Sequence, residues 1–155
     1  DIALSSDFIV GFPGESDVDF EATLDLVREI GFAQSYSFKY SPRPGTPAAA
    51  ARKQIPEAVQ DERLARLQAL LNAQISDFAA GLVGQTFEVL FERPGRYAGQ
   101  LIGRSPHLQP VHVFAPDHAI GDFARVRVKE AKPRSVSAEI VSGRAPEARV
   151  AAVAL

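Results

Sequence analysis

The chain has 155 residues, of which 46% are hydrophobic and 23% charged, proportions typical of a soluble globular protein without a membrane-spanning segment. It contains no cysteine, which excludes disulfides, thiolate metal sites and cysteine nucleophiles. The net charge of −2 conceals an asymmetry. Residues 1–30 carry eight acidic residues and one arginine, whereas residues 84–155 carry ten basic and seven acidic residues, so the C-terminal part is better suited to an anionic partner.

The first part of the chain predicts a strand, a loop, a helix and a second strand. Residues 2–10 are mostly apolar and lead into the Gly/Pro-rich residues 11–14, which cannot continue a strand. Ser16 is a good helix N-cap, and apolar residues recur at helical spacing until Gly31. Residues 35–41 then alternate between small polar or basic and aromatic side chains. This order requires a crossover connection, so we expect parallel strands with any ligand at their carboxyl ends.

Several polar residues of this segment have a structural and a functional interpretation. Asp7 either bonds a backbone amide at the end of its strand or lies at the mouth of a site. Helix capping explains the acidic residues within 15–19. Because a buried parallel strand is usually apolar on both faces, the face with the serines and Lys39 predicts a strand that lines a cavity. Arg43, in a stiff proline-rich turn, is either an anion ligand or merely exposed.

Residues 57–80 predict one long helix, because apolar residues recur at intervals of three and four and Pro56 suits a first helical position. At 1.5 Å per residue this helix would be about 36 Å long. From Gln85 the apolar period changes to two, and turn residues separate five short segments. Such segments predict a small antiparallel barrel of the OB-like kind. The predicted strands are residues 86–91, 97–104, 111–114, 123–129 and 136–141.

Basic residues in this predicted barrel form a candidate RNA-binding surface. Three of them alternate along one predicted strand and so share a face, two follow in the next turn, and two are expected on adjacent strands. A solvated face and a phosphate-binding surface explain such a charge run equally well. The candidate residues are Arg93, Arg104, Arg125, Arg127, Lys129, Lys132 and Arg134.

Aromatic residues of the same segment mostly occupy alternating apolar positions, which favours a place in the core over a role in base stacking. Tyr97, between Gly95 and Gly99, is the one that the sequence leaves open as exposed. Binding of RNA is therefore expected to be led by phosphates and only weakly by bases. The aromatic residues concerned are Phe87, Phe91, Tyr97, Phe114 and Phe123.

Two motifs resemble a known enzyme family. Residues 7–15, DFIVGFPGE, followed by residues 20–24, resemble the fifth strand and helix of the radical S-adenosylmethionine methylthiotransferases. Residues 40–48, YSPRPGTPA, resemble their sixth strand and its exit loop, and residues 62–67 the following helix. The five-strand segment resembles the TRAM domain that closes these enzymes. The resemblance covers nearly the whole chain apart from the C-terminal tail.

The resemblance implies a fold of the class α/β plus all-β. A partial parallel (β/α) radical-SAM barrel segment with a long connecting helix would occupy residues 1–83. A five-stranded antiparallel OB-like TRAM barrel would occupy residues 84–142, and residues 143–155 would form a loose tail. The chain would be the C-terminal portion of such an enzyme.

The residues at 5–8 and 37–40 are most similar to the tRNA branch of the family, which adds a methylthio group to C2 of N6-isopentenyladenosine next to the anticodon. The resemblance therefore implies a cytoplasmic enzyme with S-adenosylmethionine and two [4Fe-4S] clusters as cofactors and the tRNA anticodon stem-loop as partner. This chain lacks the cluster cysteines, so we expect it to be inactive alone, with no catalytic residue and no metal ligand. The three histidines lack the spacing of a helical zinc site.

By the same resemblance, the loop after the first strand and the polar face of the second would line the S-adenosylmethionine pocket. The open edges of a truncated barrel would also favour self-association. A different class of function stays open, namely a stand-alone RNA-binding module whose α/β segment is only a scaffold. The candidate cofactor-binding residues are Asp7, Gly11, Pro13, Gly14, Tyr40 and Arg43.

Overall fold

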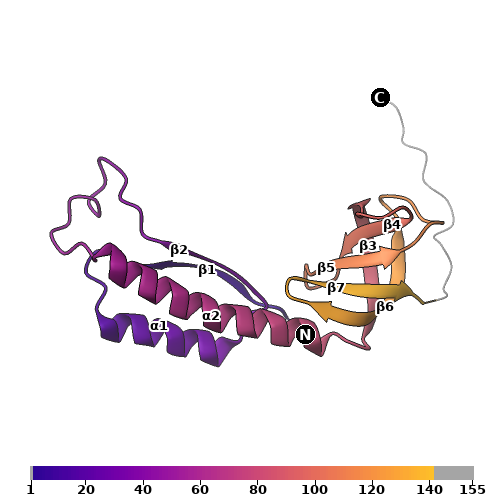
Figure 1. Ribbon diagram of the computed structural model, residues 1–155, viewed down its shortest axis with the longest axis horizontal. Helices are drawn as coiled ribbons and strands as arrows, with labels where there is room; N and C mark the ends of the chain where they lie inside the picture. Colours follow the sequence, from indigo (N-terminus) through magenta and orange to yellow (C-terminus); the bar gives the residue numbers. More distant parts are fainter. Residues whose placement is uncertain (1, 142–155) are drawn as a thin grey trace. The chain divides into compact units, whose positions relative to one another are not determined.

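The computed structural model describes residues 2–141, drawn in colour in Figure 1. The chain divides into two compact units, residues 1–77 and residues 78–155. Helix α2 (Glu57–Gly81) is the long helix that the sequence predicts; it begins in the first unit and ends in the second. The tail expected at residues 143–155 lies outside the described residues.

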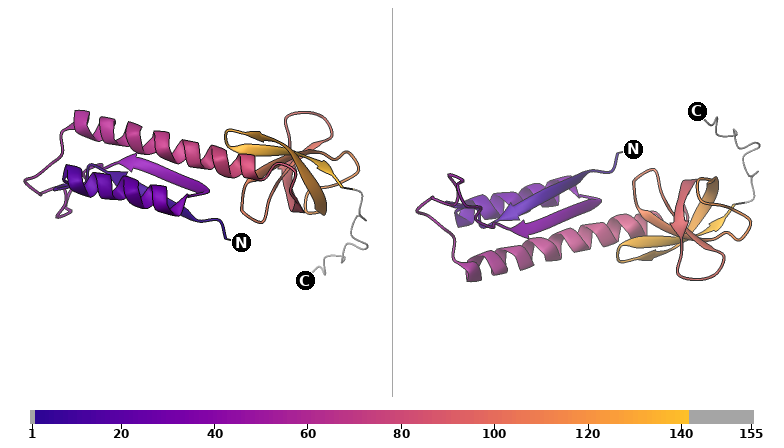
Figure 2. Two further views of the ribbon diagram at one scale, coloured as in Figure 1. Left: turned by 90° about the horizontal axis from the view of Figure 1, so that it is seen from below. Right: turned by 90° about the horizontal axis from the view of Figure 1, so that it is seen from above.

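The first unit is built on two parallel strands, as the sequence predicts. Strand β1 (Ser5–Val10) pairs along its whole length with β2 (Gln34–Lys39), and helix α1 (Asp17–Ile30) connects them. In this unit α1 and α2 lie on the same side of the two-stranded sheet, which leaves the opposite side of the sheet uncovered (Figures 1 and 2). The strands end together at the loops that follow Val10 and Lys39.

Helix α1 forms because its ends are capped and one of its faces is apolar. Ser16 Oγ accepts a hydrogen bond from the backbone N–H of Asp19 (3.2 Å), and the Asp19 carboxylate accepts one from the backbone N–H of Ser16 (2.9 Å). Gly31 ends the helix in the left-handed conformation. Full burial of each apolar side chain stabilises the unit by about 1.5–3 kcal/mol. The core comprises Val10, Phe20, Leu24, Val27, Phe32, Leu67 and Leu71.

The two faces of β2 have different surroundings. On the face with the serines, Lys39 Nζ donates to Asp61 (2.7 Å) and Glu57 (3.1 Å) of α2. These hydrogen bonds raise the pKa of Lys39. The opposite face is open, with Tyr36 and Phe38 each more than half exposed. The aromatic face is therefore accessible to another molecule.

The second unit is a closed five-stranded barrel. Its strands are β3 (Thr86–Pro94), β4 (Gln100–Arg104), β5 (Pro110–Phe114), β6 (Phe123–Lys132) and β7 (Ser135–Ile140). Their order around the barrel is β3-β4-β5-β7-β6. The prediction of a small five-stranded barrel is confirmed.

The prediction that this barrel is purely antiparallel is wrong. Strand β5 pairs with β7 in parallel, whereas the other four pairs are antiparallel. A closed ring with an odd number of strands cannot alternate direction at every neighbour, so at least one parallel pair is required. The barrel is therefore mixed, and the parallel pair is the closure between β5 and β7.

The barrel interior holds the larger hydrophobic core, in which Phe91 is fully buried. A bulge in β6 between Val128 and Glu130 interrupts the alternation of that strand. After the bulge, Ala131 packs against the core while Lys132 faces outward. The core residues are Ala79, Leu82, Val89, Phe91, Val111, Val113, Ala115, Ala124, Val126, Val128 and Val136.

Candidate functional site

The loop after β1 is a tight turn held by backbone hydrogen bonds. Gly11 and Gly14 have φ angles of 72° and 90°, a region that side chains rarely allow. The N–H of Glu15 donates to the carbonyl of Phe12 (2.9 Å), and the N–H of Gly14 donates to the carbonyl of Lys53 (2.8 Å). The loop thus has one conformation, fixed both within itself and to the segment before α2.

A buried ion pair attaches the same loop to α2. Arg63 Nη1 donates to Glu15 Oε2 (2.6 Å) and to the Glu15 carbonyl (3.2 Å), and Glu15 Oε2 also accepts from the N–H of Gly11 (2.7 Å). Arg63 Nη2 donates to Asp17 (2.5 Å). Burial lowers the pKa of Arg63, but the hydrogen bonds to Asp17 and Glu15 outweigh it and raise the pKa above its usual value. Arg63 is therefore a permanent cation at this position.

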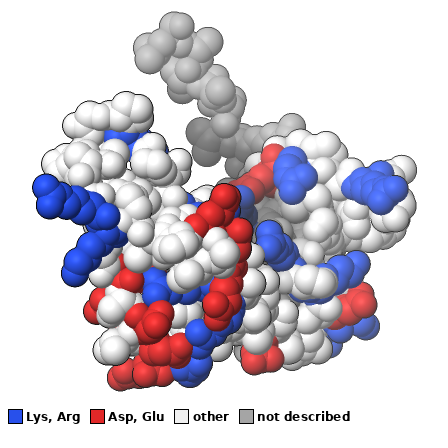
Figure 3. Space-filling view, turned by 60° about the vertical axis from the view of Figure 1, so that its left-hand side comes forward, with Lys and Arg blue, Asp and Glu red and all other residues white. Residues whose placement is uncertain are grey.

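This ion pair corrects the sequence interpretation of the acidic residues at the start of α1. Capping accounts for Asp19, which completes the capping box with Ser16. It does not account for Glu15 and Asp17, whose carboxylates bind Arg63 of the distant helix. Figure 3 shows acidic and basic side chains next to one another on the displayed face.

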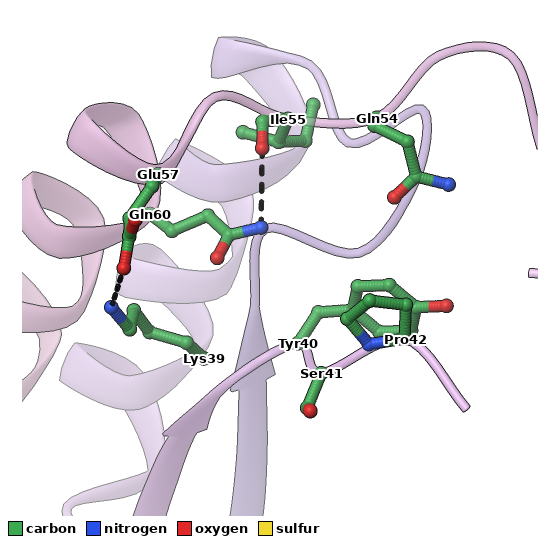
Figure 4. A pocket seen from close by; sticks show the side chains of 8 residues that line it. All are labelled: Lys39, Tyr40, Ser41, Pro42, Gln54, Ile55, Glu57 and Gln60. Atoms are coloured by element: carbon green, nitrogen blue, oxygen red, sulfur yellow. Dashed lines mark hydrogen bonds and ion pairs between the residues drawn. The ribbon is translucent and has the colours of Figure 1, made fainter. Parts of the chain in front are cut away.

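A cleft of about 490 Å³ opens at the carboxyl end of β2, between the chain after the strand and the start of α2 (Figure 4). Its size is within the usual range of small-molecule pockets. Gln60, which the sequence did not single out, links the cleft to the turn after β1, because Gln60 Nε2 donates to the carbonyls of Ile55 (3.2 Å) and Gly11 (3.4 Å). The lining residues are Lys39, Tyr40, Ser41, Pro42, Gln54, Ile55, Glu57 and Gln60.

Tyr40 is the predicted cofactor residue that the structure places in this cleft. Its N–H donates to the carbonyl of Val10 (2.8 Å), and its ring packs edge-on against Phe12 at a centroid distance of 5.2 Å. The hydroxyl of Tyr40 is buried yet has no hydrogen-bond partner among residues 2–141. Since a buried hydroxyl without a partner costs about 1–3 kcal/mol, a bound polar group that pairs with it would be stabilised.

The other predicted cofactor residues do not line the cleft. Gly11, Pro13 and Gly14 form the adjoining turn. Asp7 lies on the exposed face of β1, four residues and roughly 13 Å of strand before the turn. Asp7 and Arg43 are not among the residues that line the cleft, and no hydrogen bond or ion pair joins their side chains to other described residues.

In the barrel, β6 places three of the predicted RNA-binding residues outward. Arg125, Arg127 and Lys129 are all exposed. Cross-strand neighbours supply acidic groups that the sequence window did not show: Glu88 lies opposite Arg125, and Glu139 lies opposite Arg127. Lys129 Nζ also donates to Glu139 (3.3 Å). This face is therefore of mixed charge.

A second group of predicted residues lies around His112 of β5. Arg93 of β3 and Lys132 of β6 are exposed, and neither has an acidic partner within the part of the chain that the structure describes. Burial, Lys132 and Arg93 together lower the pKa of His112. The strand register agrees, because Arg93 lies opposite Ile102, the partner of His112, and Lys132 lies opposite Ser135, two residues from the Ser137 that also pairs with His112. The structure thus gathers Arg93 and Lys132 on a face different from that of Arg125.

The remaining two predicted basic residues, Arg104 and Arg134, differ in their contacts. Arg104 Nε donates to Glu92 (3.3 Å), and its Nη1 donates to the Leu108 carbonyl (3.1 Å). Arg134 is exposed in the two-residue turn between β6 and β7. Arg104 is therefore largely engaged within the barrel, whereas Arg134 is accessible.

The placement of aromatic residues differs in part from the prediction. Phe91 is buried and Phe87 is half-buried against the core, as expected. Tyr97, which the sequence left open as exposed, is 68% exposed, but Phe114 and Phe123, which were expected in the core, are 68% and 53% exposed. The alternation of the strand could have predicted the position of Phe114. Phe114 follows Val113, which points inward, and must therefore point outward.

Neither a metal site nor a membrane span is found in the part of the chain that the structure describes. No group of three or more histidine and acidic residues is arranged to hold a metal ion there. None of the described helices is both long and apolar enough to cross a bilayer.

Comparison with known proteins places this chain next to a family of tRNA-modifying enzymes. Residues 81–141 match the model of the TRAM domain. A tRNA-2-methylthio-N(6)-dimethylallyladenosine synthase of Sphingopyxis alaskensis is 61% identical over 139 residues, which cover 90% of this chain and 31% of the relative. The chain thus spans about a third of the length of this curated relative. The resemblance inferred from the two loop motifs and the five-strand segment is confirmed.

Proposed function

We propose that this chain contributes the cofactor-facing α/β segment and the TRAM barrel of a tRNA methylthiotransferase. The reaction would add a methylthio group to C2 of N6-isopentenyladenosine next to the anticodon. The observation that carries this proposal is the 61% identity over 90% of the chain to an enzyme whose name states that product. The cytoplasmic location expected from the sequence goes with this proposal.

In this proposal, β1 and β2 are part of a parallel (β/α) barrel of the radical-SAM kind. Their parallel pairing, with both helices on one side, supports that assignment. The uncovered side of the sheet would then be the one that meets the rest of the enzyme. Self-association of the isolated chain through the same side stays a prediction.

The residues of the cleft fit S-adenosylmethionine. The hydroxyl of Tyr40 is a buried donor without a partner in the described chain, and the cleft is large enough for a ligand of this class. When bound, S-adenosylmethionine would supply the methyl group and the radical chemistry. Tyr40 would hold a polar group of the cofactor, and the turn at residues 11–14 would let it approach the backbone closely.

The two [4Fe-4S] clusters implied by the resemblance do not fit this chain. Such clusters are held by cysteine thiolates, and the sequence contains none. Residues of this chain therefore hold neither cluster. Its part in the reaction is to bind and orient the cofactor and the RNA.

The RNA partner would be the anticodon stem-loop of tRNA, bound by the barrel. Exposed cations without an ion-pair partner among the described residues, Arg93, Lys132 and Arg134, support this assignment because phosphate contacts dominate the affinity of RNA-binding surfaces. Arg125, Arg127 and Lys129 contribute less, since acidic residues lie beside them. Sequence choice would be left mainly to the catalytic pocket.

The proposal is tested with a chimeric enzyme. The matching 139-residue segment of the Sphingopyxis alaskensis synthase is replaced by that of this chain, and the nucleosides of treated tRNA are analysed by mass spectrometry. We expect the 2-methylthio nucleoside, with the native synthase as control. A folded chimera that keeps its clusters and binds tRNA but forms no methylthio product would contradict the proposal and favour a stand-alone RNA-binding module.

A further inference from the structure

We propose that the outer face of β4 and β5 is a binding site for unpaired RNA nucleotides, with Phe114 and Tyr97 as stacking platforms and Arg93 and Lys132 as phosphate contacts. The inference rests on the proposed RNA-binding function of the barrel and deepens it. It names the class of RNA that the barrel prefers and the side of the barrel that binds it.

Phe114 has the geometry of a stacking platform. It ends β5 on the outside of the barrel and is 68% exposed, although apolar rings of this size are usually buried. One side of its ring lies against the backbone of Gly99, where an added Cβ would stand only 2.8 Å from Phe114 Cε2. The ring therefore packs against the loop on one side, while its exposed surface can stack on a base.

Tyr97 stands in the loop that Phe114 covers. This loop is fixed by its own hydrogen bonds, because Gly95 N–H donates to the Gln100 carbonyl (2.7 Å) and Arg96 N–H donates to Gln100 Oε1 (3.0 Å). Gln100 lies directly opposite Phe114 in the pairing of β4 with β5. The Arg96 guanidinium lies 6.0 Å from the centroid of the Tyr97 ring. A second aromatic ring and a cation therefore adjoin the first platform.

Cations flank these rings on the same face. His112 precedes Phe114 by two residues and so faces the same way along β5. Strand register places Arg93 of β3 opposite Ile102, the β4 partner of His112, and places Lys132 of β6 opposite Ser135 of β7, the strand on the other side of β5. Neither cation has an ion-pair partner among the described residues. Rings for bases beside unpaired cations for phosphates are the combination that single-stranded nucleic acids require.

This face differs from the outer face of β6 in the features that decide whether a surface prefers single-stranded or double-stranded RNA. Arg125 and Arg127 face acidic neighbours across the strands, and Phe123 is the exposed ring on that side. A duplex offers no free base faces to a surface ring, because its bases already stack on one another. The Phe114 face should therefore discriminate in favour of unpaired nucleotides.

The test measures binding of two fluorescent RNAs to the full chain by anisotropy at low salt: a short single strand and a hairpin duplex of the same composition. Phe114→Ala should weaken single-strand binding by about 5- to 100-fold, the range seen when one stacking residue is removed. Phe114→Tyr should retain it, and duplex binding should change by less than about 2-fold. Phe123→Ala, a matched exposed phenylalanine on the other face, should leave both affinities unchanged. Circular dichroism confirms that each variant is folded.

Two results would overturn the inference, and they are distinguishable from failure of the proposed function. If the wild-type chain binds RNA but Phe114→Ala and Phe123→Ala behave alike, the stacking site is wrong while RNA binding stands. The same holds if Phe114→Tyr binds as weakly as Phe114→Ala. If the wild-type chain binds neither RNA at low salt, RNA binding by the barrel fails as well.

Discussion

The buried pair between Arg63 and Glu15 gives the sharpest prediction about the first unit. The side chains of Arg63 and Glu15 are 6% and 12% exposed, so neither charge can be solvated if its partner is removed. Replacing one member of a buried pair typically costs about 3–5 kcal/mol. Glu15 would keep its hydrogen bond from Gly11, so we expect the lower end for Arg63→Met, about 3 kcal/mol.

Amide hydrogen exchange measured by NMR is the suitable assay, because it reads the two units separately. A loss of about 3 kcal/mol corresponds to roughly 100-fold faster exchange of the protected amides in β1 and α1. Amides of the barrel provide an internal reference, since they belong to the other unit. The double variant Glu15→Gln with Arg63→Met should exchange more slowly than Arg63→Met alone, because no unpaired carboxylate remains buried.

Arg66 is the matched control. It lies over the same Phe20 ring as Arg63, at 5.1 Å against 5.5 Å, and it also pairs with a glutamate, in this case Glu21 of α1. It is 44% exposed, however, and exposed pairs contribute at most about 1 kcal/mol. If Arg63→Met accelerated exchange no more than Arg66→Met, the reasoning from burial would be refuted.

Three further predictions concern the barrel. Gly103→Ala should lower the free energy of unfolding in urea by about 3 kcal/mol, because the added Cβ would clash with the backbone carbonyl oxygen of Leu90 in β3; an unchanged midpoint would contradict this. Replacing Lys132 and Arg134 together by alanine should lower the log–log salt slope of tRNA binding by about 1 to 2 units, and an unchanged slope would show that other residues hold the phosphates. Burial, Lys132 and Arg93 hold the pKa of His112 below the ordinary 6.5, so the unfolded chain takes up a proton that the folded barrel resists. The stability contributed by neutral His112 is present above about pH 6.5 and is lost as the pH falls below it. When the pH is lowered from about 7 to about 5, the free energy of unfolding measured in urea should therefore decrease less for His112→Asn than for the wild type. Equal decreases would rule out this role.

Local signals in the sequence predicted much of the fold. The N-cap Ser16 and the terminating Gly31 mark the ends of α1 correctly, because capping depends on residues within one turn. The switch to a period of two after Gln85 locates the barrel, since alternation is a property of each strand by itself. Alternation also implied that Phe114 points outward, but the sequence interpretation placed it in the core because it is aromatic.

Features that depend on contacts between distant residues could not be predicted in this way. Glu15 and Arg63 are 48 residues apart, and no local pattern pairs them. A parallel pair such as that of β5 with β7 is required because the number of strands is odd, but this argument applies only once the barrel is known to be closed. The acidic neighbours of Arg125 and Arg127 come from cross-strand register, which the sequence does not state. The cleft beside Tyr40 likewise depends on where α2 begins relative to the strand ends.

The proposed function assigns the cleft beside Tyr40 to the cofactor of a tRNA methylthiotransferase. The most direct measurement is the Michaelis constant for S-adenosylmethionine of the chimeric enzyme with Tyr40→Phe, which removes only the unpartnered hydroxyl. The loss of one hydrogen bond, about 1 kcal/mol, should raise this constant by about 5-fold and leave the constant for tRNA unchanged. An unchanged constant for S-adenosylmethionine, or an equal rise in the constant for tRNA, would contradict this assignment of the cleft.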